Sequence, residues 1–231
     1  MPTRLIDVGK RGEPEVPRLI ETATAEHYDY IALSHCWGGH VALTTTPETF
    51  EQHKEAIPLE DFPLTFRDAV DFTRKMDMKY LWIDSLCIIQ GDKSDWEREA
   101  AIMGEIFKNS TLTISTTTAN NSTKGFLHPR TPRFQPIKVI HSKNTNPLFI
   151  RDILLRPWLK SWSQSVEGPD GPLSSRGWIL QERLLPPRPL HFGHEQMFWE
   201  CRTALILEGH PYNPVSLEDG DLYFELGGGT N

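Results

Sequence analysis

The chain has 231 residues, of which 38% are hydrophobic and 24% charged, so it is long and apolar enough to bury a core. Its 24 Lys and Arg against 31 Asp and Glu give a formal net charge of −7, and no basic stretch offers a phosphate-binding stripe, which argues against a nucleic-acid partner. The polar N-terminal stretch and the lack of a long apolar run predict neither a signal peptide nor a membrane span, and hence a cytoplasmic protein.

The N-terminal segment, residues 1–29, is expected to lead into the main domain as a hairpin. Residues 4–8 and 16–21 are short strand-like runs on either side of the turn-forming sequence GKRGEP. The next run, Tyr30–Ser34 (YIALS), is almost entirely apolar and ends at a glycine turn. It predicts the first buried strand of the core.

Two helix–strand pairs follow. Thr65 and Asp68 resemble a capping box and open a helical pattern over residues 65–76, after which the apolar YLWI predicts a strand over 80–83 that ends at Asp84. Ser94 and Glu97 form a second capping box, which predicts a helix over 95–108. The β-branched TLTIST at 111–116 predicts a third strand.

This alternation predicts an α/β fold with a parallel sheet and flanking helices, because short strand–helix–strand connections favour right-handed parallel crossovers. The βαβαβ core would span residues 30–120. Ligands of such sheets bind beyond the carboxyl ends of the strands. Residues 34–39, residues 84–90 and the start of the second helix should therefore share one cleft.

The second half of the chain is richer in proline. We expect a loop-rich insertion over residues 121–175, then a helix near 178–185 and a hairpin of strands 189–192 and 197–201. The large apolar residues of 176–201 should pack on the core, since they are too many for a free linker. Residues 202–231 are expected to form a C-terminal tail.

Glu99 is the unusual carboxylate of the predicted second helix. On a helical wheel it falls inside the apolar stripe that contains Trp96 and Met103, whereas Glu97 and Glu105 point elsewhere. A buried carboxylate near a helix N-terminus suits catalysis. A structural ion pair with Arg176 or Arg183 is an equally weighted alternative.

Other chemistries have weaker support. Ser34 and His35 are neighbours on a strand and point to opposite faces, so they cannot form a dyad, and no spacing selects a distant His for Cys36. A metal site from His191, His194 and Cys201 lacks a ligand-spacing pattern, and we predict no metal. Trp37 and Trp96 flank the expected cleft and either stack on a flat ligand or serve as packing.

Three blocks of the sequence resemble the fungal heterokaryon incompatibility (HET) domain. They are YIALSHCWGG, the stretch from PLTFRDAV to TLTIST, and RGWILQERLLPPRPLHFGHEQMFWEC, and they span residues 30–201 in the family's order. The resemblance implies nonself recognition and regulated cell death after the fusion of unlike fungal cells. It also implies an incompatibility partner protein or a homo-oligomer as the partner.

The HET family is in turn similar to Toll/interleukin-1 receptor (TIR) domains, which have a flavodoxin-like parallel sheet. Some TIR domains cleave NAD⁺ with a Glu that follows a Trp on the helix after a central strand. The similarity places SDWEREAAIM at that position and assigns the catalytic carboxylate to Glu99.

We therefore expect an effector that acts by NAD⁺ glycohydrolysis, with NAD⁺ as substrate and no cofactor. Glu99 would stabilise an oxocarbenium-like state. The expected binding residues are Ser34, His35, Trp37, Gly38, Asp84, Asp95 and Trp96. The rival hypothesis is a non-enzymatic signalling module that works by protein–protein assembly, in which Glu99 is a structural ion pair.

Overall fold

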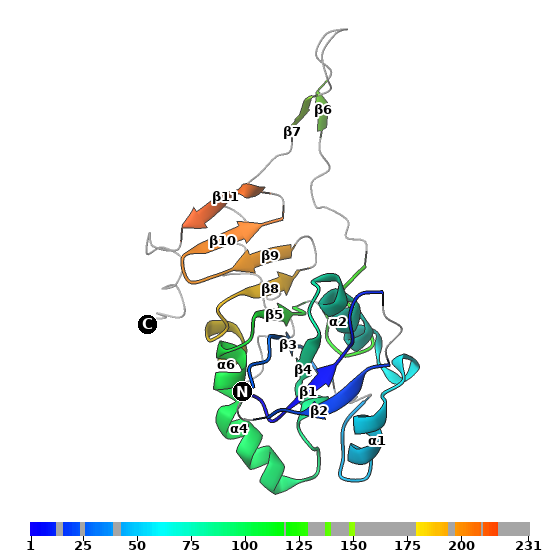
Figure 1. Cartoon of the computed structure of the whole chain (residues 1–231). Coiled ribbons are helices and arrows are strands. Elements are labelled where there is room, and N and C mark those ends of the chain that lie inside the picture. The colour runs from blue at the N-terminus through cyan, green and yellow to red at the C-terminus, as the bar shows by residue number, and fades with distance from the viewer. Residues whose placement is uncertain are drawn as a thin grey trace, which may run out of the picture.

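The computed structural model describes residues 1–12, 16–23, 26–38, 43–117, 119–128, 137–139, 148–150, 179–193, 197–208 and 210–216. Its main feature is a nine-stranded mixed sheet with the order β11-β10-β9-β8-β5-β3-β4-β1-β2 (Figure 1). The strands are β1 Arg4–Asp7, β2 Arg18–Glu21, β3 Tyr30–Ser34, β4 Tyr80–Ile83, β5 Leu112–Ser115, β8 Pro189–Phe192, β9 Met197–Glu200, β10 Ala204–Leu207 and β11 His210–Ser216.

The centre of the sheet is parallel, as predicted. β3 lies between β4 and β5 and pairs with both in parallel, with Ala32 opposite Trp82 on one side and Thr113 on the other. All five residues of β3 are buried. The chain therefore runs from β3 to one neighbour and back across to the other, and this reversal is where α/β sheets open a crevice.

Helices fill both crossovers. The first contains α1 (Phe50–Glu55), a 3-10 turn (Leu59–Asp61) and α2 (Leu64–Lys75), and the second contains α3 (Asp84–Cys87) and α4 (Lys93–Lys108). α1 and α3 were not predicted. The short helix α6 (Ile179–Leu184) contacts α4.

The two faces of the sheet can be read from the contacts of β3, of its neighbour β4 and of His35, the residue that follows β3. Tyr30 donates a hydrogen bond to a backbone carbonyl of α4, and Trp82 of β4 packs edge-on against Phe107 of α4. His35, of opposite parity to Tyr30, packs edge-on against Phe66 of α2. The face with α4 and α6 is thus opposite the face with α2.

The outer strands extend the parallel centre of the sheet with antiparallel pairs at both edges. β1 and β2 form the predicted hairpin, but β1 also pairs antiparallel with β4 and so extends the sheet at one edge. At the other edge β8 joins β5 in parallel, and β9, β10 and β11 continue antiparallel. Residues 204–207 and 210–216, expected in a tail, are therefore strands.

Both predicted capping boxes are wrong. α4 starts two residues early because the Asp92 side chain accepts hydrogen bonds from the backbone amides of Ser94 and Asp95. These hydrogen bonds lower the pKa of the Asp92 carboxyl, and the bond from the Asp95 amide has the largest effect. Asp68 of α2 instead accepts from the amides of Phe126 and Leu127, so it holds a loop rather than its own helix.

The C-terminal part packs on the core where it is described. Phe192 is 2% exposed and lies within the main hydrophobic cluster, and Phe198 is also buried, whereas Leu184 is exposed. Trp178 lies outside the described residues. Within the expected insertion 121–175, the described parts include a loop ending at residue 128 and an antiparallel pair, β6 (Ile137–Val139) and β7 (Leu148–Ile150).

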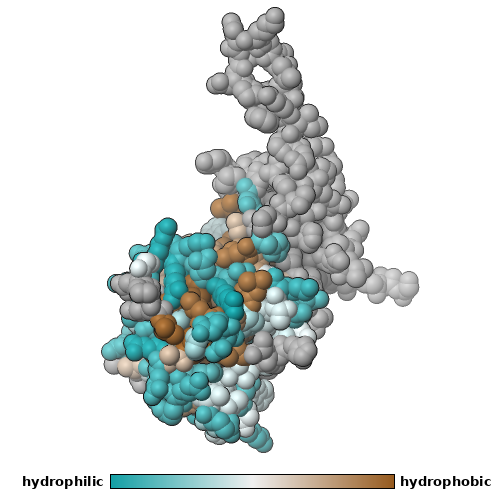
Figure 2. Space-filling model, turned by 90° about the vertical axis from the view of Figure 1, so that its right-hand side faces the viewer, coloured by the Kyte–Doolittle hydropathy of each residue, from teal (hydrophilic) through white to brown (hydrophobic). Residues whose placement is uncertain are grey.

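Figure 2 shows one face of the molecule, where the described surface is largely hydrophilic and apolar residues gather toward the centre. No helix in the described ranges combines the length and the apolar character needed to cross a membrane.

Candidate functional site

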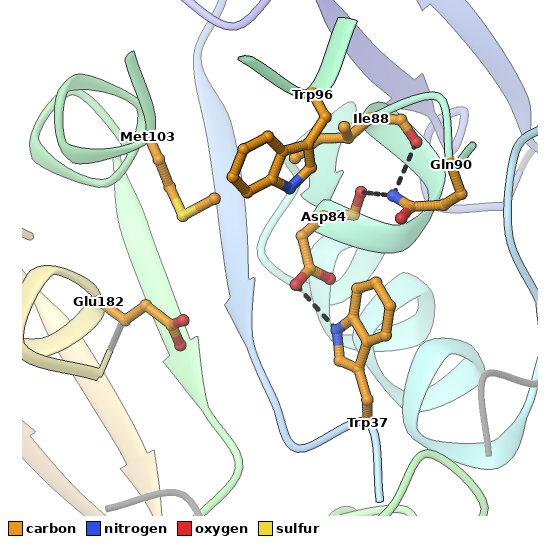
Figure 3. A pocket seen from close by; sticks show the side chains of 7 residues that line it. All are labelled: Trp37, Asp84, Ile88, Gln90, Trp96, Met103 and Glu182. Carbon is orange, nitrogen blue, oxygen red and sulfur yellow. Dashed lines mark hydrogen bonds between the residues drawn. The ribbon is translucent and has the colours of Figure 1, made fainter. Parts of the chain in front are cut away.

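A pocket of about 190 Å³ lies at the carboxyl ends of the central strands. Its lining comes from the loop after β3, from the β4–α4 connection, and from the helices α4 and α6 (Figure 3). The residues that line it are Trp37, Asp84, Ile88, Gln90, Trp96, Met103 and Glu182. This described lining includes two indoles and two carboxylates, and it contains no Lys or Arg.

Trp37 and Asp84 join the ends of β3 and β4. The indole Nε1 of Trp37 donates to Asp84 Oδ2 at 2.8 Å, and Asp84 Oδ1 accepts from the Ser85 amide at 2.7 Å. His35 is buried below, with Nδ1 3.9 Å from Asp84 Oδ1. The Asp84 side chain is thus fixed in orientation at one wall of the pocket, and His35 lies next to it on the α2 side of the sheet.

Gly38 shapes the loop that carries Trp37. Its φ of 66° lies in the left-handed region, and a Cβ placed there would come within 2.2 Å of Asn121 Cβ and 2.4 Å of the Asn120 carbonyl oxygen. Only glycine fits without movement. Gly38 therefore allows the loop to follow its course past Asn120 and Asn121, and it is not among the residues that line the pocket.

Trp96 and Met103 bring α4 into the pocket. They are seven residues apart and lie on the same face of the helix. The Trp96 side chain is 48% exposed at the opening, whereas Met103 is buried. A flat group that entered the pocket would find aromatic and thioether surfaces on this side.

Glu182 reaches the pocket from α6, and sequence analysis had not selected it. The residue is 5% exposed, and its Oε2 accepts a hydrogen bond from the Ser34 hydroxyl at 2.5 Å. Ser34 points to the α4 and α6 face of β3, so it meets the pocket through Glu182 rather than through the residues beside it in sequence.

Asp95 and Glu99 belong to a buried ionic cluster that is separate from the lining of the pocket. The Arg4 guanidinium of β1 donates to Asp95 and lies 4.0 Å from Glu99 Oε1, while Arg98 donates to Asp95 and lies 3.8 Å from Glu99 Oε1. Thr3 also donates to Glu99 Oε1. Two carboxylates thus face two guanidinium groups.

Glu99 itself is fully buried, as the helical wheel predicted. Its neighbours match the alternative of a structural ion pair, but the arginines beside it are Arg4 and Arg98 instead of the expected Arg176 or Arg183. Arg183 lies 3.8 Å from Glu200, and Arg176 is outside the described residues. The Oε2 atom of Glu99 has no hydrogen-bond partner among the described residues.

The remaining candidates do not gather into a site. His191 is buried, stacks on Phe198 and lies 3.1 Å from Glu200, on the far side of β5 from the pocket-lining loops. Cys36 and Cys201 are partly exposed free thiols, and His194 is outside the described residues. Within the described ranges no three His, Cys, Asp or Glu side chains are placed to bind a metal ion.

Comparison with known proteins identifies the family. The sequence model of the heterokaryon incompatibility protein (HET) family matches residues 30–182, which run from the first residue of β3 to the Glu182 carboxylate. No curated protein and no solved structure matches the chain. The match covers all the described residues that line the pocket, and the chain belongs to the heterokaryon incompatibility protein (HET) family.

Proposed function

We propose that this HET-family protein acts in heterokaryon incompatibility as an effector that hydrolyses NAD⁺ at the nicotinamide–ribose bond and thereby causes cell death. The observation that supports this proposal most directly is the character of the pocket. It lies at the crevice of the parallel strands and combines the indoles of Trp37 and Trp96 with the carboxylates of Asp84 and Glu182.

The lining suits a flat cation. Tryptophan faces attract positive charge, and nearby carboxylates add to that attraction. The nicotinamide ring of NAD⁺ is flat and carries a positive charge, whereas phosphate groups would be repelled by Asp84 and Glu182. The volume of about 190 Å³ is below the roughly 300–1,000 Å³ of pockets for drug-sized ligands, so it suits one end of a dinucleotide.

The reaction needs little covalent chemistry from the protein. When the bond between ribose C1′ and the ring nitrogen breaks, its electron pair moves to nitrogen, nicotinamide leaves as a neutral molecule, and positive charge develops on the ribose. Water then adds at C1′ and releases one proton, which gives ADP-ribose. A carboxylate fixed near C1′ stabilises the cationic state electrostatically.

Glu99 is the carboxylate that the resemblance to TIR domains assigns to this role. It is buried on α4, three residues after Trp96 and four before Met103. To contact a ligand in the pocket, it would have to leave Thr3 and the guanidinium groups of Arg4 and Arg98. An active form of this kind requires the Glu99 side chain to exchange these contacts for the ligand.

Those same contacts of Glu99 favour a second candidate function. Glu99 and Asp95 join α4 to β1, as a structural ionic cluster does. In that case the domain would signal by assembly with copies of itself or with an incompatibility partner, without turnover.

The test is nicotinamide release from NAD⁺ by the purified protein. It should be followed at high protein concentration, since an assembly-dependent site is silent in a dilute monomer. If Glu99 stabilises the cationic state, Glu99→Gln lowers turnover by about a hundredfold or more. Glu105→Gln, on the exposed side of the same helix, should leave turnover unchanged.

Two results would contradict parts of this proposal. A protein that releases no nicotinamide at any concentration would leave the assembly function as the explanation. A Glu99→Gln protein that releases nicotinamide at the parental rate would remove Glu99 from the mechanism while leaving NAD⁺ hydrolysis in place.

A further inference from the structure

We propose that Glu182, oriented by Ser34, is the carboxylate that contacts the cationic end of the ligand in this pocket and stabilises positive charge as the N-glycosidic bond breaks. This inference rests on the proposed function and adds to it a residue that the resemblance to TIR domains does not assign. It is carried by the position, burial and support of the Glu182 side chain.

The position of Glu182 sets it apart from Glu99. Glu182 lines the pocket, whereas Glu99 lies outside the lining. In Figure 3 the Glu182 carboxylate points from α6 toward the middle of the pocket, across from Asp84 and Trp37 and below Met103 and Trp96 of α4. A ligand held against the Trp96 indole would therefore meet this carboxylate without any rearrangement of the ionic cluster.

Burial makes the charge of Glu182 effective. The residue is only 5% exposed, so water screens its field weakly, and a carboxylate in such a place acts strongly on a nearby cation. Asp84, the other carboxylate of the lining, is committed to the Trp37 indole and the Ser85 amide. Asp84 therefore positions Trp37, and Glu182 brings a second carboxylate to the lining from the side of α6.

Ser34 fixes the orientation of Glu182. Its hydroxyl donates to Glu182 Oε2 from the last residue of β3, a strand held by parallel neighbours on both sides. Ser34 is thus a positioning residue, and the support comes from a fully buried strand at the centre of the sheet.

The place of α6 is set by two contacts. A Cβ added to Gly104 of α4 would come within 3.0 Å of Leu185 Cδ1, so the missing side chain lets the end of α6 approach α4 closely. On its other side Arg183 of α6 lies 3.8 Å from Glu200 of β9. Leu185 and Arg183, which make these contacts, lie within three residues of Glu182 in the sequence. Together the two contacts fix the position of α6, and so of Glu182, at the pocket that Met103 also lines.

The test compares a cation with a neutral molecule of the same shape. We would measure the binding of 1-methylnicotinamide, a pyridinium that cannot be hydrolysed, and of nicotinamide by the fluorescence of the full chain, since Trp37 and Trp96 line the pocket. The parent protein should prefer the cation. Glu182→Gln should lose at least about tenfold in affinity for 1-methylnicotinamide and change little for nicotinamide.

Matched variants separate this role from general damage. Ser34→Ala should weaken cation binding by less than Glu182→Gln, and Glu105→Gln should leave it unchanged, because Glu105 is exposed and away from the pocket. Glu182→Asp keeps the charge but shortens the side chain. It should retain the preference for the cation and lose about tenfold or more in nicotinamide release from NAD⁺.

Several outcomes would overturn the inference. They are a parent protein that binds neither probe or does not distinguish them, a Glu182→Gln protein with parental affinity for 1-methylnicotinamide, or a Glu182→Asp protein with parental turnover. A parent protein that prefers the cation through Glu182 but never releases nicotinamide would instead refute the proposed hydrolysis and keep Glu182 as the cation-binding residue.

Discussion

Ser34 and His35 show how strongly strand geometry separates neighbouring residues. Ser34 donates to Glu182 on the α6 side of the sheet, whereas His35 packs against Phe66 of α2 on the other side. Their opposite directions follow from the period of two in a strand, so sequence alone was enough to exclude a Ser–His dyad. It was not enough to find the partner of Ser34, which lies 148 positions away.

The ionic cluster around Glu99 leads to a prediction about stability. Glu99→Gln removes one charge, but Arg4 and Arg98 both keep Asp95, so we expect a loss of about 1–3 kcal/mol in the free energy of unfolding. Arg4→Met leaves two buried carboxylates with one partly exposed guanidinium and should cost about 3–5 kcal/mol.

Urea unfolding of the two variants and of Glu105→Gln measures these differences. Glu105 is exposed, so its variant should stay within about 0.5 kcal/mol of the parent. If Arg4→Met were as stable as the parent, the cluster would have no structural role. The catalytic role of Glu99 would then be the better explanation of its burial.

At the scale of elements, the site depends on where loops and short helices touch one another. The β3 loop that carries Trp37 rests on the segment 119–128, at Asn120 and Asn121. That segment is itself held to α2, because Thr65 and Asp68 accept hydrogen bonds from the amides of Gly125, Phe126 and Leu127. The pocket wall is therefore supported from the opposite face of the sheet.

Gly38→Ala should disturb this support. The left-handed backbone costs about 1–2 kcal/mol for a residue with a Cβ, and the contacts with Asn120 and Asn121 force a further shift of the loop. We expect lower stability in urea and weaker binding of 1-methylnicotinamide, since Trp37 moves with the loop.

Gly12→Ala is the matched control, because Gly12 also has a positive φ but a Cβ there meets nothing within 4 Å. It should show only the cost of the backbone conformation and no change in binding. Equal effects of the two variants would mean that the contact with Asn120 and Asn121 does not hold the loop.

At the scale of the whole molecule, the strands after the family match complete the core. Phe192 of β8 packs against Phe72 of α2 and Phe126 with ring centroids 5.7 Å and 4.6 Å apart. Its backbone carbonyl accepts a hydrogen bond from Thr117. The second half of the chain thus contributes to the same hydrophobic cluster as β3 and β4.

Phe192→Ala should therefore cost about 3–5 kcal/mol, as expected for a large aromatic removed from a filled core. Leu184→Ala, at an exposed position of α6, should change the free energy of unfolding by about 0.5 kcal/mol or less. Urea unfolding gives both values.

Limited proteolysis of the full chain provides an independent check. Cleavage should not release residues 1–130 as a stable soluble fragment, because that fragment would expose β5 and the surfaces of Phe72 and Phe126 that Phe192 covers. Recovery of such a fragment, together with a mild effect of Phe192→Ala, would show that the second half folds separately.

The sequence by itself determined the elements whose signals are local and the family. Continuous apolar runs marked β3 and β4, alternation with helices predicted their parallel pairing, and the helical period placed Glu99 on the buried side of α4. These predictions succeeded because burial on both faces of a parallel strand, and on one face of a helix, leaves a repeating pattern along the chain. The predicted helix starts were wrong because Asp68 bonds to a distant loop and Asp92, rather than Ser94, caps α4. The spacing of capping residues does not specify either of these hydrogen-bond partners.

Only the tertiary structure brought the Glu182 carboxylate into the pocket and left Glu99 outside its lining. Glu182 lies on a six-residue helix, too short for a hydrophobic period to mark one of its faces. Its hydrogen-bond partner Ser34 and the other residues of the pocket lining come from distant segments. Likewise, nothing local distinguishes Arg4, the partner of Glu99 and Asp95, from Arg176 or Arg183, the partners expected from the sequence. Contacts between elements depend on how the sheet brings them together, and that arrangement is set by long-range packing rather than by any short stretch of the chain.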